Sequence, residues 1–243
     1  MNSPTPGPTL RPPSPIPLWP LPLIAGLLPA VGSLIALAYS IHLQLIPACN
    51  PFIDGCVSVS RAARYDLSNY IFRAMTLPGA ALQGLTWILV AHWLRPIAPK
   101  HQRSLRFVPW LGLIAAIALI AYGTFLGTEG QAYRWLRAYG TVIYFGLTCI
   151  AMILAGGAIR EAAGAQRIAV PLRSDVALLG FAGALLALGV ANAILGPMFD
   201  GQMKDKIENI TEWWGSLVFT LVFMAIAAIW RRNRVSASMS ALR

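Results

Sequence analysis

Charged side chains are scarce in this sequence: only 12% of its 243 residues are Asp, Glu, Lys or Arg, whereas 57% are hydrophobic. A water-soluble domain usually carries about a quarter charged residues, so an ordinary soluble surface cannot be built around this chain. Several uncharged stretches reach the roughly 20 residues that cross a ~30 Å hydrocarbon core. The composition therefore excludes a cytosolic enzyme and indicates an integral membrane protein.

Lysine is also rare, and common catalytic motifs are absent. The lysines, Lys100, Lys204 and Lys206, lie outside the apolar stretches, which excludes a retinal Schiff base or a buried lysine nucleophile. The sequence contains no GxSxG, HExxH, GKS, GKT or CxxCH motif. We therefore expect no metal, no cofactor and no nucleic-acid partner. The net charge of +10 is better explained by orientation in a membrane.

The apolar stretches set the expected fold class, an all-α polytopic membrane protein with a bundle of six transmembrane helices. The predicted spans cover residues 18–46, 69–94, 107–127, 135–159, 176–199 and 213–230. They form one domain, 18–230. A proline-rich cytoplasmic tail precedes it at 1–17, and a basic cytoplasmic tail follows at 231–243.

The orientation follows from the distribution of charge between the spans. Most of the 19 Lys and Arg residues lie in four segments, the N-terminal tail, 95–106, 160–175 and 231–243. Positively charged segments stay on the cytoplasmic side, so both termini are predicted to be cytoplasmic. The loops 47–68, 128–134 and 200–212 then face outward and hold most of the 9 acidic residues. The high Ala and Leu content favours a bacterial inner membrane.

Two of the three cysteines, Cys49 and Cys56, lie in the first outer loop. An outward location permits a disulfide, which we favour over two unpaired thiols. The loop holds no His or further Cys that could complete a metal site with this pair.

Polar side chains enter three of the spans at helical spacing, so that each set occupies one helical face. The three stripes are Asn69, Arg73, Thr76 and Gln83; Arg137, Thr141, Tyr144 and Thr148; and Glu212, Ser216 and Thr220. Each begins near the outer surface and continues inward. Because polar groups inside a membrane are costly, they usually face other helices or a wet cavity.

Arg73, Arg137 and Glu212 are predicted at nearly the same depth, with Glu129 just outside the third span. We expect these residues to converge on an outward-opening pocket, where Arg is suited to the phosphate of a lipid headgroup. The alternative is a structural ion-pair network with arginines that snorkel to the interface.

Three segments carry a family resemblance: CNPFIDGCVSVSRAARYDLSNYIFR at 49–73, GTEGQAYRWLRAYGTVIYF at 127–145 and ENITEWWGSLVF at 208–219. They resemble the damage-regulated autophagy modulator and post-GPI-attachment lipid-remodelling factor family. The resemblance implies six membrane helices, cytoplasmic ends and a role in lipid handling. The family-type positions would be Ser58 or Ser60, Tyr70, Arg73 and Glu212. The family histidine expected near the start of the fourth span is absent, with Arg137 or Tyr139 in its neighbourhood.

The leading hypothesis is a lipid-handling membrane protein that recognises a phospholipid or glycolipid headgroup and regulates its distribution or modifies it. Catalysis is left open, because it would need a base such as Glu212 or Asp54 within reach of a hydroxyl or water. The alternative is a non-catalytic accessory subunit whose polar stripes face helices of a membrane-protein partner.

Overall fold

The computed structural model describes residues 15–195, 198–199 and 201–237, so most of the predicted tail 1–17 and the end of the predicted tail 231–243 lie outside the described residues. In chain order the elements are β1 (Ile16–Pro17), α1 (Pro20–His42), α2 (Val59–Ala62), α3 (Asp66–Leu94), η1 (Pro99–His101), α4 (Gln102–Leu105), α5 (Val108–Thr124), α6 (Gln131–Gly164), η2 (Pro171–Arg173), α7 (Ser174–Leu195), α8 (Gln202–Arg232) and β2 (Ser236–Ala237).

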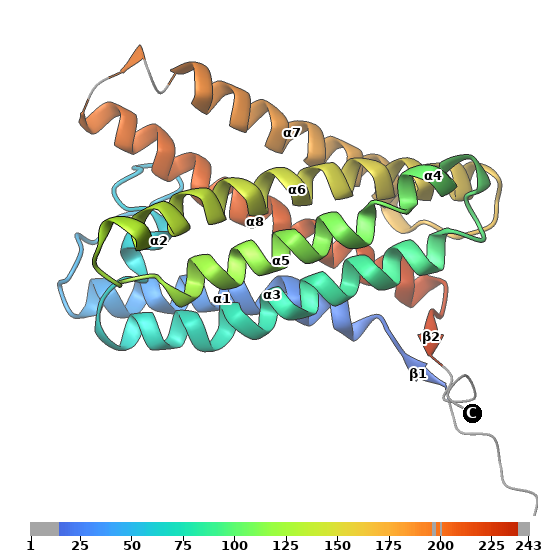
Figure 1. Ribbon diagram of the computed structural model, residues 1–243, viewed down its shortest axis with the longest axis horizontal. Coiled ribbons are helices and arrows are strands. Elements are labelled where there is room, and N and C mark those ends of the chain that lie inside the picture. The colour runs from blue at the N-terminus through green and yellow to red at the C-terminus, as the bar shows by residue number, and fades with distance from the viewer. Residues whose placement is uncertain (1–14, 196–197, 200, 238–243) are drawn as a thin grey trace, which may run out of the picture.

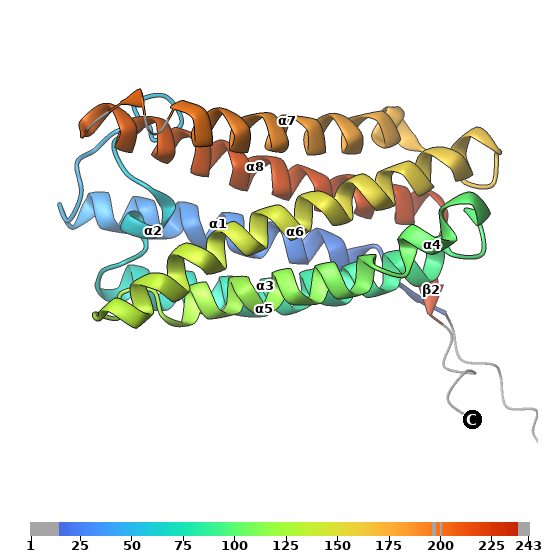
Figure 2. The same cartoon turned by 45° about the horizontal axis from the view of Figure 1, so that its top comes forward.

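Six helices among the described residues are long and apolar enough to cross a membrane, which confirms the predicted all-α, six-span fold class. They form a ring in chain order (Figures 1 and 2): α1 packs on α3, α3 on α5, α5 on α6, α6 on α7, and α7 on α8, while α8 returns to α1. Each helix thus lies beside its neighbours in sequence, as expected for spans joined by short connections.

Glycines permit the closest contacts between helices α1, α3 and α5. A Cβ at Gly79 on α3 would lie 2.8 Å from the ring of Pro29 on α1. A Cβ at Gly112 on α5 would lie 2.3 Å from the Cβ of Trp87 on α3. Membrane helices gain their packing energy from such close approach, because lipid supplies no hydrophobic drive between them.

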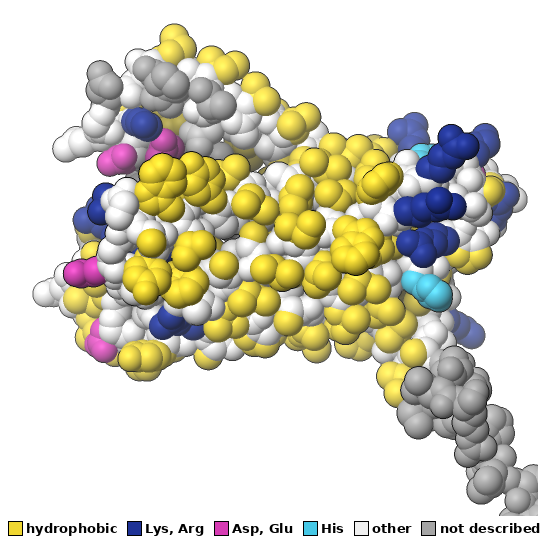
Figure 3. All heavy atoms as spheres, viewed as in Figure 1, with side chains coloured by type: hydrophobic (Ala, Val, Ile, Leu, Met, Phe, Trp, Pro, Cys, Tyr) yellow, Lys and Arg dark blue, Asp and Glu magenta, His cyan; other side chains and the backbone are white. Residues whose placement is uncertain are grey.

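Both described ends of the chain lie at the same end of the bundle, as an even number of spans requires. There β1 pairs antiparallel with β2, with Ile16 opposite Ala237. Lys and Arg side chains gather at this end, near α4, and Asp and Glu side chains gather at the opposite end (Figure 3). The positive end is therefore cytoplasmic, with both termini on that side.

Two of the outer loops are shorter than predicted. α6 already begins at Gln131 and α8 at Gln202, so most of the predicted loops 128–134 and 200–212 is helical. Hydropathy marks where lipid contact ends, whereas the hydrogen bonds of a helix continue into water. Glu212 therefore lies about three turns into α8, not at its start.

Candidate functional site

The three predicted polar stripes meet around one cavity inside the ring of helices. Thr76 and Gln83 reach it from α3, Thr141 and Tyr144 from α6, and Glu212, Ser216 and Thr220 from α8. The other lining residues are Gly26, Pro29, Ala30, Ser33, Val59, Phe72, Leu119, Tyr122, Phe145 and Phe219. The centres of water-sized molecules can occupy about 60 Å³ of it. The space therefore suits a few waters or one small polar group.

Gln83 closes the inner part of the cavity by joining three helices. Its Nε2 donates to the carbonyl of Ala25 on α1 at 3.0 Å, and its Oε1 accepts from the hydroxyl of Tyr144 on α6 at 3.0 Å. Pro29 explains why this carbonyl is free, because proline has no N–H for the carbonyl four residues before it. Pro29 on α1 thus leaves a carbonyl without its helical partner, and the amide of Gln83 on α3 donates to that carbonyl.

Two buried hydroxyls facing the cavity have no hydrogen-bond partner among the described residues, those of Thr76 and Tyr122. Their residues are only 1% and 7% exposed. Ser60 and Glu212 are polar neighbours of Tyr122, but neither makes a well-formed hydrogen bond to its oxygen. An unpartnered buried hydroxyl costs about 1–3 kcal/mol, so these groups call for a water or a ligand atom in the cavity.

Glu212 supplies the one carboxylate in the cavity wall. The backbone amides of Val59 and Ser60, at the start of α2, are polar neighbours of this carboxylate. Below it on α8, Ser216 donates to the carbonyl of Glu212 at 2.9 Å and Thr220 donates to the carbonyl of Ser216 at 3.0 Å. Because these two hydroxyls donate their hydrogens to backbone carbonyls of α8, their oxygens can still accept hydrogen bonds in the cavity.

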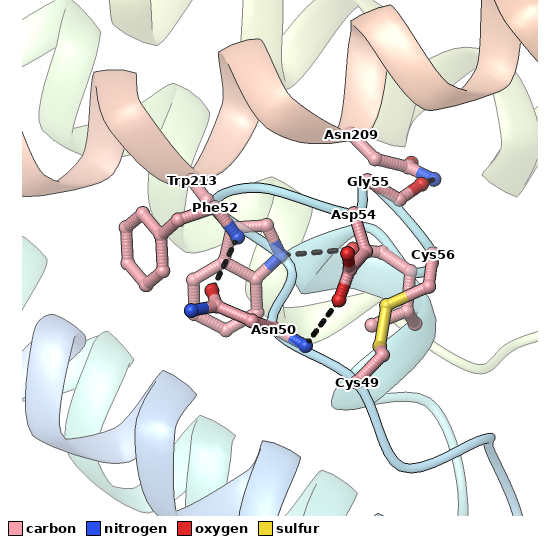
Figure 4. The surroundings of a disulfide bond; sticks show 9 residues. Cys49, Asn50, Phe52, Asp54, Gly55, Cys56, Asn209 and Trp213 are labelled. Carbon is pink, nitrogen blue, oxygen red and sulfur yellow. Dashed lines mark hydrogen bonds between the residues drawn. A yellow bond between two sulfur atoms is a disulfide. The ribbon is translucent and has the colours of Figure 1, made fainter.

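The connection between α1 and α3 carries a disulfide (Figure 4) and reaches the cavity wall at Val59. The predicted disulfide between Cys49 and Cys56 is confirmed, with 6.6 Å between the two Cα atoms. The loop is fastened to α8 by three hydrogen bonds: Asn209 donates to the carbonyl of Gly55, Trp213 to that of Val57 and Trp214 to that of Phe52.

Aromatic packing adds to this attachment, with the ring of Phe52 lying 5.4 Å from that of Trp213 and 5.7 Å from that of Trp214 between centroids. Asp54, considered above as a base, is not in the cavity wall. Its carboxylate accepts from the backbone N–H of Asn50 at 2.8 Å, which holds a turn of the loop.

The two arginines do not line the cavity, which corrects the expected convergence with Glu212. Arg73 Nε donates to the carbonyl of Gly123 at 3.1 Å, and Arg137 Nη1 donates to the carbonyls of Phe125 at 2.9 Å and Thr128 at 2.7 Å. Both side chains therefore bind carbonyls at or just beyond the outer end of α5. Within the described part of the chain no ion pair joins either arginine to a carboxylate.

The remaining predicted residues divide in the same way. Gln83 and Tyr144 face the cavity and bond to each other, and Ser60 lies in the α2 segment above it. Glu129 and Tyr70 are exposed and stand outside the cavity wall, Tyr70 at 68% exposure. A role of any of these residues in headgroup binding stays a prediction.

The sequence reasoning missed the contributions of α1 and α5. Tyr122 stands alone in an apolar span, so no stripe marked it, although a single Tyr near the outer end of such a span was a signal. Pro29 was a second signal. A proline inside a helix leaves the carbonyl four residues earlier without its helical hydrogen bond, so a polar side chain is expected to donate to it.

The chain matches a known protein family over most of its length. A model of the Frag1/DRAM/Sfk1/Cwh43P N-terminal domain matches residues 17–229. The chain belongs to this family. The Frag1/DRAM match extends over all six spans, and it confirms the resemblance noted in the three outer segments. Frag1/DRAM proteins are membrane proteins with roles in lipid and membrane processes. No curated protein and no solved structure matched the chain.

Proposed function

We propose that this protein handles a membrane lipid by holding a polar part of it in the central cavity, in the outer half of the bundle. The observation that carries the proposal is the pair of buried, unpartnered hydroxyls of Thr76 and Tyr122 beside the carboxylate of Glu212. Family membership agrees with a lipid-related role. The protein would regulate the distribution of that lipid or modify it.

The chemistry of the cavity wall favours a hydroxyl or an ammonium group over a phosphate. The wall offers one carboxylate, one amide and several hydroxyls, while Arg73 and Arg137 are occupied by carbonyls at or just beyond the outer end of α5. A carboxylate attracts an ammonium and accepts from a hydroxyl, but it repels a phosphate. The headgroups of phosphatidylethanolamine and phosphatidylglycerol provide these two groups. A bacterial inner membrane, proposed on composition alone, would offer both.

Tyr122→Phe tests the proposal sharply, because it deletes a single atom that makes no well-formed hydrogen bond to a described residue. We expect this variant to fold with equal or higher thermal stability, since a buried unpaired hydroxyl is removed. It should nevertheless bind dioctanoyl phosphatidylethanolamine or dioctanoyl phosphatidylglycerol about 5-fold or more weakly, as measured by native mass spectrometry of the full chain.

Tyr139→Phe is the matched control, because Tyr139 is 54% exposed and stands outside the cavity wall. It removes the same atom and should leave binding of both lipids unchanged. Equal lipid binding by wild type, Tyr122→Phe and Tyr139→Phe would refute the cavity as the lipid site.

A second candidate, an accessory subunit of a membrane-protein complex, is favoured by one feature of α7. Cβ atoms built at Gly180, Gly183 and Gly189 meet nothing within 4 Å, so these small residues serve no close contact within the chain. Small residues permit another helix to approach. A photocrosslinker at Ile194, 60% exposed on the same helix, should then capture a partner protein in native membranes. Crosslinks to lipid alone would reject this candidate.

A further inference from the structure

The cytoplasmic end of the bundle holds a second polar hollow, far from the central cavity. It has a volume of about 330 Å³ and is lined by Arg95, Gln102 and Arg106. Arg95 directly follows α3, Gln102 begins α4, and Arg106 directly follows α4. The segment from the end of α3 to the end of α4 thus places two guanidinium groups and one amide around the same space.

The positive charge of this hollow is not compensated within the described residues. Neither Arg95 nor Arg106 has a carboxylate within 4 Å or a side-chain hydrogen bond among them. The nearby carboxylate of Glu161 is already used, since it bonds to His101 Nδ1 at 2.8 Å and accepts from the backbone N–H of Lys100 at 3.3 Å.

Two other arginines at this end have partners within the protein. Arg167 donates to the carbonyl of Ile97 at 2.9 Å, and the guanidinium of Arg231 lies 5.3 Å from the ring centroid of Trp19. Arg95 and Arg106 are therefore distinguished from these two by facing a shared space with their donors free. Figure 3 shows the basic side chains gathered at this end of the bundle.

Large exposed aromatic side chains follow Arg106 along the chain. Phe107 and Trp110, at the start of α5, are 63% and 66% exposed. Aromatic side chains at this level lie where lipid headgroups meet acyl chains. A lipid whose phosphate lies between the two arginines would therefore have its glycerol and chains near the membrane level of these rings.

We propose that this hollow binds the phosphate of an anionic phospholipid in the cytoplasmic leaflet, with Arg95 and Arg106 as the charged donors and Gln102 as a neutral one. Guanidinium groups present paired N–H donors that match phosphate oxygens. A phosphomonoester headgroup such as that of phosphatidic acid fits best, because it offers more negative charge and more free oxygens than a diester. This site is independent of the central cavity and of the function proposed for it.

The test measures binding of dioctanoyl phosphatidic acid to the purified full chain by native mass spectrometry. We expect Arg106→Gln to weaken binding about 10-fold or more, and Arg106→Lys, which keeps the charge but loses the paired donors, to weaken it by less. Arg103→Gln is the matched control: Arg103 is exposed on the same short helix but does not line the hollow, so binding should change by less than about twofold.

Two results would overturn the proposal. Equal weakening by Arg103→Gln and Arg106→Gln would show that general surface charge attracts the lipid without a built site. Displacement of the lipid by inorganic phosphate at the same concentration would show that the hollow takes free phosphate, not a lipid. Dioctanoyl phosphatidylcholine, which has a diester phosphate and no net charge, should bind at least 10-fold more weakly than phosphatidic acid. Unchanged melting temperatures of the variants establish that they fold.

Discussion

Arg73→Ala should destabilise the protein and leave lipid binding in the cavity unchanged. The side chain is half-buried and makes two hydrogen bonds, from Nε to the carbonyl of Gly123 and from Nη1 to Oδ1 of Asn69 at 3.3 Å. Asn69 in turn donates to the carbonyls of Ala63 at 3.0 Å and Leu126 at 3.1 Å. One small network thus joins the start of α3 to the end of the outer loop and the end of α5.

The loss should be about 2 kcal/mol, because a hydrogen bond from a charged group contributes about 1.5–3 kcal/mol and Arg73 is not fully buried. For a chain of this size that corresponds to a fall of about 4–8 °C in melting temperature. The assay is thermal unfolding of the full chain in mild detergent, beside lipid binding by native mass spectrometry. Arg134→Ala, an exposed arginine on the same side of the membrane, is the control and should shift the melting temperature by less than about 1 °C.

Combining Arg73→Ala with Glu212→Gln separates the two accounts of Arg73. If Arg73 compensated the charge of Glu212, the second substitution would restore stability. We expect no such recovery, since Arg73 binds the carbonyl of Gly123 and the side chain of Asn69 and forms no ion pair with Glu212. An unchanged melting temperature together with lost lipid binding in Arg73→Ala would refute this structural role. It would show instead that Arg73 takes part in lipid binding.

Four further predictions concern the cavity, the outer loop and the topology. Gln83→Leu should lower the free energy of unfolding by about 2–4 kcal/mol in chemical denaturation, because a buried carbonyl and a buried hydroxyl both lose their partner. Gly55→Ala should detach the outer loop, since its φ is +59° and its Cβ would collide with the carbonyl of Lys206; limited proteolysis of the loop should then become faster. Unreduced peptides should contain the Cys49–Cys56 link, and two free thiols would contradict it. A cysteine at position 236 should be labelled only from the cytoplasmic side, so labelling from outside would overturn the topology.

The fold could be predicted almost entirely from the sequence, because the length of an apolar stretch and the placement of Lys and Arg are properties of single segments. The predicted inner end of the second span, residue 94, coincides with the end of α3. The ends of α6 and α8 could not be predicted in this way, since both helices continue with polar residues beyond the apolar core.

The candidate site could be predicted only in part. Helical spacing correctly grouped Gln83 with its stripe and Tyr144 with another, and the two side chains do meet. Spacing on one helix cannot show which partner a side chain finds on a neighbouring helix, above all when that partner is a backbone carbonyl. Counting side-chain charges therefore suggested ion pairs where the structure has arginine bound to the end of α5.

The order of helices in the ring explains why equal depth did not bring Arg73, Arg137 and Glu212 together. α5 packs between α3 and α6, so an arginine on either neighbour reaches the carbonyls around the outer end of α5 before it reaches α8. Glu212 is thereby left without a cation in the described structure, and the cavity wall holds one acidic side chain and no basic one. A lipid that enters it must bring a donor, whereas the site proposed for a phosphate lies at the opposite, cytoplasmic end. The same chain would then distinguish the two parts of a phospholipid by the side of the membrane on which each is presented.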